Sequence, residues 1–130
     1  MLLVALWVVV MLLGSGSSAQ ADDPLAQQLT CKAAIAAIMS RDPAIIKVEG
    51  QAGGTFHLSY VRNDNTRWAY RCKVVGTQVI WATETGRWRD HPQDERVFYE
   101  AIAGGTGVKI IQRWGDGSKA ERTYSREQLQ

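Results

Sequence analysis

The stretch RWAYRCKVV, Arg67–Val75, has the clear alternation of a β-strand. Successive side chains of a strand point to opposite faces, so the residues fall into two sets. One face is basic, and the other is apolar and carries Trp68, Tyr70, Cys72 and Val74. We therefore expect this strand to lie at the centre of the fold, with Cys72 turned toward the core.

Upstream of this strand, the segment 22–39 has the features of a helix. An aspartate at position 22 or 23 can cap its N-terminus, and Pro24 suits its first turn. Ile35, Ile38 and Met39 follow Cys31 at helical spacing, so the four side chains form one apolar stripe. The sequence thus predicts an amphipathic helix that packs through the face bearing Cys31.

Cys31 and Cys72 are the two cysteines of the chain. Each falls on the apolar side of its predicted element, and an oxidising compartment would favour their pairing. Two free thiols or a redox pair are the alternatives, but no Cys-x-x-Cys motif is present. We expect a Cys31–Cys72 disulfide that joins the helix to the strand.

Short apolar runs separated by turn residues fill the rest of the chain. This spacing is typical of consecutive hairpins, and Ser125 begins a capping-box pattern for a last helical turn. The predicted fold class is α+β, with an N-terminal helix packed on an antiparallel meander sheet of five to seven strands. The runs are 45–49, 55–62, 67–75, 78–83, 96–103 and 108–114.

The N-terminus resembles an export signal in its order of residues. An apolar run, 2–13, precedes small and polar residues and the sequence Ala19-Gln20-Ala21. We predict a signal peptide over 1–21, a single domain over 22–130, and a periplasmic or secreted location. An uncleaved anchor is the alternative, but the run is shorter than the roughly 20 residues that span a bilayer. We expect no membrane span in the mature chain.

Charge and motifs narrow the classes of function. A formal net charge of +2 is too small to predict nucleic-acid binding, so no nucleic-acid partner is expected. The sequence has no Gly-x-Ser-x-Gly elbow, phosphate-binding glycine loop or His-Glu-x-x-His motif. We therefore predict no cofactor, no metal site and no catalytic residue, which favours a protein that is not an enzyme.

The candidate binding site is the segment 84–95, which is long for a hairpin connection. We predict that Arg87 and Arg89 supply charge, Trp88 an apolar anchor and His91 a polar contact. The other two Arg-Trp pairs, at 67–68 and 113–114, are interpreted as a solvent-facing arginine beside a core tryptophan.

The favoured function is a small exported, non-catalytic protein that binds an envelope protein or a cell-wall polymer. One alternative is an envelope hydrolase that uses two carboxylates, for example Glu84 and Asp94. Another is an accessory subunit whose sheet edge pairs with a neighbour in an envelope assembly. The oligomeric state is left open.

Overall fold

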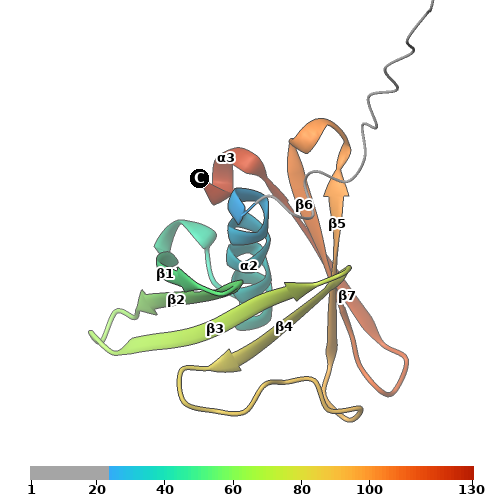
Figure 1. Cartoon of the computed structure of the whole chain (residues 1–130), viewed down its shortest axis with the longest axis horizontal. Coiled ribbons are helices and arrows are strands. Elements are labelled where there is room, and N and C mark those ends of the chain that lie inside the picture. Colours follow the sequence, from blue (N-terminus) through green and yellow to red (C-terminus); the bar gives the residue numbers. More distant parts are fainter. Residues whose placement is uncertain (1–23) are drawn as a thin grey trace, which may run out of the picture.

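A computed structural model describes residues 24–130, in which one helix is followed by a single seven-stranded antiparallel sheet (Figure 1). The strands are in sequence order, so the sheet is a meander and the predicted α+β fold is confirmed. The predicted signal peptide, 1–21, lies outside the described residues. The elements are α2 (Pro24–Met39), η1 (Pro43–Ile45), β1 (Lys47–Ala52), β2 (Thr55–Val61), β3 (Arg67–Val75), β4 (Gln78–Thr83), β5 (Arg96–Ile102), η2 (Ala103–Gly105), β6 (Gly107–Arg113), β7 (Lys119–Ser125) and α3 (Arg126–Leu129).

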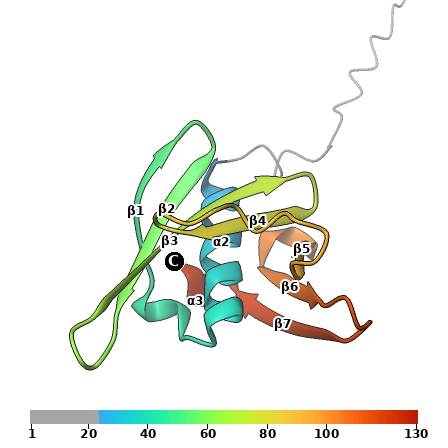
Figure 2. The ribbon, with the colours of Figure 1, turned by 90° about the horizontal axis from the view of Figure 1, so that it is seen from below.

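The sheet curves around α2, so the helix lies in the middle of the domain (Figure 2). The helix contacts every strand from β1 to β6 and is buried on nearly all sides. The prediction of a single apolar stripe was therefore too narrow. The reason is the alanine content of the helix, since small side chains at Ala33, Ala34, Ala36 and Ala37 let strands approach from several directions.

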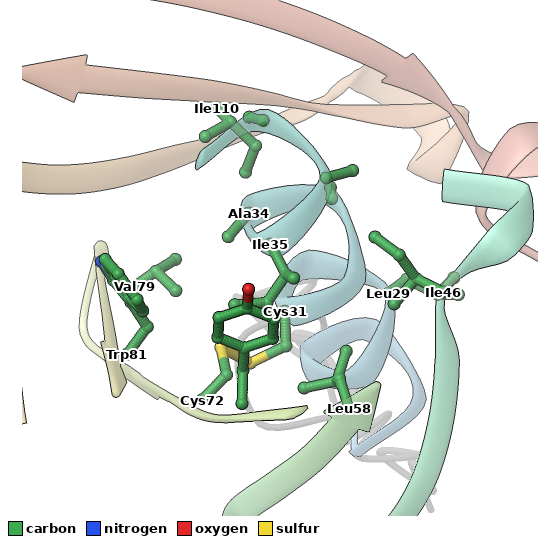
Figure 3. Packing of buried hydrophobic residues seen from close by; sticks show 14 of the residues in the cluster. Leu29, Cys31, Ala34, Ile35, Ile46, Leu58, Cys72, Val79, Trp81 and Ile110 are labelled. Carbon is green, nitrogen blue, oxygen red and sulfur yellow. A yellow bond between two sulfur atoms is a disulfide. The ribbon is translucent and has the colours of Figure 1, made fainter. Parts of the chain in front are cut away.

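The predicted disulfide is confirmed. Cys31 and Cys72 are both 0% exposed, and their Cα atoms are 5.8 Å apart. Figure 3 shows the bridge joining α2 to β3 within the apolar core, close to Ile35 and Leu58. The bridge thus lies inside the packed layer between helix and sheet.

The sheet is weakest between β4 and β5. Only two residue pairs join these strands, Gln78 with Phe98 and Val79 with Val97. By contrast, six pairs join β3 to β4 and seven join β5 to β6. The second half of β4 therefore separates from β5, and the segment 84–95 runs between their ends (Figure 1).

The predicted positions of Trp68 and Trp114 in the core were wrong. Their exposed fractions are 44% and 39%. Trp68 lies near the end of the β2–β3 hairpin, where its Nε1 donates to Thr66 Oγ1 over 3.2 Å and Arg62 lies over its ring. Alternation assigns the face of a strand, but whether that face is covered depends on how far the helix extends beneath it.

The first strand begins two residues later than predicted. Asp42 caps a short 3₁₀ turn, because its Oδ1 accepts the N–H of Ala44 over 2.9 Å and Pro43 follows it. The strand then runs on to Ala52.

The last strand, β7, was not predicted individually from the sequence. The predicted capping box at Ser125 is confirmed by reciprocal hydrogen bonds with Gln128.

Removing the disulfide should lower the stability of the domain strongly. The two cysteines lie 41 positions apart in the sequence, for which loop-closure entropy predicts a loss of about 4 kcal/mol in the free energy of unfolding. Urea unfolding of the oxidised protein and of a Cys31→Ala, Cys72→Ala double variant measures this difference. The reduced wild type should unfold near the midpoint of the variant. Equal midpoints for the oxidised protein and the variant would refute a stabilising bridge.

Candidate functional site

The segment 84–95 folds back onto the outer face of the sheet, away from α2. Arg71 and Lys73 flank the inward-facing Cys72 on β3 and therefore point outward. The ring of Trp88 covers both side chains, with its centroid 4.7 Å from Arg71 Cζ and 4.3 Å from Lys73 Nζ. The indole is thus held by two cations on β3, and it remains partly exposed.

Arg71 also fixes the beginning of the segment through its main chain. Its Nε donates to the carbonyl oxygen of Thr83 over 3.2 Å, and its Nη2 donates to the carbonyl oxygen of Gly86. Ala82 pairs with Arg71 across the strands and is fully buried, although it lies on the outer face. The segment therefore covers this part of the sheet.

The second half of the segment is organised around Asp94. Two guanidinium nitrogens of Arg87 donate to the Asp94 carboxylate over 2.7 and 2.8 Å, and the N–H of His91 donates to it over 3.0 Å. The Asp94 side chain is only 12% exposed, and these hydrogen bonds hold its pKa well below the usual range. Asp94 is therefore ionised at neutral pH and closes the segment into a compact turn.

Three of the four predicted site residues lie around one open hollow of about 760 Å³. Arg87, Trp88 and His91 line this hollow. Asp90, Pro92 and Gln93 complete its lining, so all of its wall comes from the one segment. We call it the 84–95 hollow.

The fourth predicted residue, Arg89, lies elsewhere. Its guanidinium carbon is 5.3 Å from the ring centroid of Trp81. Its main-chain N–H donates to the carbonyl oxygen of Trp81 over 2.8 Å. Arg89 is absent from the lining of the hollow. These contacts attach the segment to β4.

The hydrogen bonds of His91 define the tautomer of its neutral ring. Its Nδ1 accepts the N–H of Gln93 over 3.2 Å, so the ring proton lies on Nε2. The side chain is exposed. His91 therefore offers a hydrogen-bond donor at the rim of the hollow.

A second polar cluster lies at the start of the segment. Arg67 donates to Glu49 over 2.5 Å and to Glu84 over 3.4 Å, and Ser59 donates to Glu49 over 2.6 Å. Hydrogen bonds from Ser59 and Arg67 lower the pKa of Glu49. Glu49, Arg67 and Glu84 border a small cavity of about 200 Å³ that His57 also lines. The cluster ties β1 and β3 to the end of β4.

The two carboxylates named for a hydrolase therefore bind different arginines. Glu84 lies with Arg67, and Asp94 lies with Arg87. Within residues 24–130, no three histidine, cysteine or acidic side chains are grouped to hold a metal ion. No helix in that same range is long and apolar enough to cross a membrane.

Sequence reasoning missed the supporting residues Arg71, Lys73 and Asp94. The alternation of β3 already indicated that the two cations face outward, on the side opposite Cys72. It could not indicate that a segment some 15 residues downstream would return to cover them. Nothing in the sequence marks which of the four carboxylates of the segment pairs with Arg87.

No family model matches the sequence, and no curated protein or solved structure is similar to it at a significant level.

Replacing Arg71 by lysine should loosen the 84–95 segment. Lysine keeps the charge beside Trp88 but cannot donate to two carbonyl oxygens as the guanidinium fork does. We expect amide exchange of the Arg89 N–H to become about tenfold faster. Hydrogen exchange measured by NMR tests this. Lys73→Ala is the control, because it leaves both carbonyl contacts in place, and equal acceleration in the two variants would contradict the role of Arg71.

The Arg87–Asp94 pair should contribute stability in a pH-dependent manner. The pKa of Asp94 in the folded protein lies below its ordinary value of 3.8, chiefly because Arg87 donates to the carboxylate. The contribution is complete above that ordinary value and disappears as the pH falls toward the lowered pKa. The wild type should therefore exceed Asp94→Asn in stability at about pH 7, and this advantage should shrink progressively as the pH falls below about 4.

Urea unfolding midpoints of both proteins across this pH range measure the effect. Asp90→Asn serves as the control, because Asp90 acts on Arg87 through its charge but its side chain makes no hydrogen bond within residues 24–130. A stability difference for Asp94→Asn that stays constant with pH would show that the ion pair contributes nothing.

Proposed function

We propose that this protein is a non-catalytic binding domain that works in the periplasm or outside the cell. It binds an envelope protein or a cell-wall polymer through the 84–95 hollow. The observation that carries the proposal is the position of Trp88. Its ring is held on two cations of β3 while it remains partly exposed beside Arg87 and His91.

The segment is held in place by contacts within the chain. Arg71 holds its beginning, Asp94 its end, and Arg89 its attachment to β4. A site that is ordered before binding loses little conformational entropy when a ligand arrives. A tryptophan fixed in this way is also the type of residue that dominates binding energy at interfaces.

The compartment is inferred from two features. The Cys31–Cys72 disulfide is of a kind that persists in oxidising compartments, and the predicted signal peptide would direct the chain there. An extracytoplasmic position exposes the hollow to envelope proteins and to the polymers of the wall.

The ionised carboxylates favour binding over hydrolysis. A glycosidase requires a carboxylic acid of raised pKa as proton donor. Hydrogen bonds from Ser59 and Arg67 lower the pKa of Glu49 instead, and hydrogen bonds from Arg87 lower that of Asp94. Arg67 also pairs with Glu84, the other carboxylate named for such a reaction.

Cross-linking in the native host tests the proposal. A Trp88→Ala, His91→Ala double variant removes the apolar anchor and the outward donor, so its cross-linked envelope partners should disappear. Trp114→Ala is the matched control, since it removes an exposed indole from the β6–β7 turn. The same partners with the same yield in all three proteins would refute the assignment of this site.

A further inference from the structure

Resting on the proposed function, we infer the chemical class of the ligand: an uncharged glycan, one sugar ring of which stacks on the exposed face of Trp88. Three features favour such a ligand: the open part of the indole, the polar groups around it, and the pairing of charges within the hollow.

Side chains of β3 cover part of the Trp88 indole. Arg71 and Lys73 approach the ring from the strand, so their side of the indole is occupied. Trp88 also lines the 84–95 hollow together with Pro92, so part of the indole stays open to a ligand. The face of an indole is electron-rich, and the C–H bonds on one side of a pyranose ring are its weakly positive complement. A sugar ring is also flat enough to cover this surface.

The polar groups around Trp88 suit hydroxyl groups. His91 offers an Nε2 donor, while Asp90 offers carboxylate acceptors and Gln93 offers both a donor and an acceptor. Within residues 24–130 the side chains of Asp90 and Gln93 make no hydrogen bond, so they are free to bind a ligand. A sugar hydroxyl both donates and accepts, and it matches such a mixed rim.

The charge balance of the hollow favours an uncharged ligand. Arg87 is the one cation in its lining, and the bidentate bond to Asp94 neutralises it. Asp90 adds a negative charge to the same wall. Arg71 and Lys73 contact the strand side of the indole and do not line the hollow. The lining of the hollow therefore offers an anionic polymer no unpaired cation.

The test measures retention of the protein, purified with its disulfide intact, on insoluble polysaccharides. The neutral supports are chitin, cellulose, xylan and mannan, and the anionic supports are heparin and polygalacturonate, each immobilised on beads. We expect binding to at least one neutral support that persists in high salt, because stacking and neutral hydrogen bonds are little screened. Trp88→Ala should weaken it about thirtyfold or more, as for other interface tryptophans.

Two further variants separate stacking from folding defects. Trp88→Phe keeps an aromatic face and should retain part of the affinity. Trp114→Ala should bind like the wild type, because its indole lies in the β6–β7 turn. Retention that is unchanged in Trp88→Ala overturns the inference, as does retention on anionic supports alone or on none.

The cross-linking experiment distinguishes failure of the glycan inference from failure of the proposed binding function. If no neutral glycan is bound but a protein is captured in a Trp88-dependent manner, the glycan inference fails and the proposed binding function stands. If neither glycan nor protein depends on Trp88, both fail.

Discussion

The geometry of β3 around Cys72 determines both the core and the candidate site. Cys72 points inward and is bonded to the central helix, whereas its neighbours Arg71 and Lys73 point outward and hold Trp88. Adjacent residues of a strand cannot share a face, so fixing the sulfur also fixes the two cations. The covalent bond that secures the helix thereby sets the orientation of the strand on which the binding segment rests.

The central helix explains the strong curvature of the sheet (Figure 2). Its alanines are buried on several sides, and strands from both halves of the sheet contact it. The two halves share only two residue pairs between β4 and β5. The helix and its disulfide therefore supply much of the cohesion that a continuous hydrogen-bonded sheet would otherwise provide. The segment 84–95 occupies the place where that continuity is lost.

Local patterns in the sequence were sufficient to predict the fold but not to predict how the candidate site is built. The alternation in Arg67–Val75, the two cysteines and the turn residues led to the helix, the meander and the bridge, all of which the structure confirms. Contacts between distant elements decide that Trp68 and Trp114 are exposed. They also decide that the Arg89 side chain lies over Trp81 and not in the hollow that Trp88 lines. Such contacts have no short-range signature. Arg71 illustrates the limit, because its outward direction could be predicted but not the carbonyl oxygens that it binds.

The way in which Arg71 holds the segment has a consequence for divergence. It binds main-chain carbonyl oxygens of Thr83 and Gly86, and every amino acid supplies a carbonyl. Side chains farther along the segment can therefore change from one descendant to another while this attachment is kept. The scaffold is in this respect suited to acquiring new ligands by substitution within a few residues, in the way that hypervariable loops do on a constant framework.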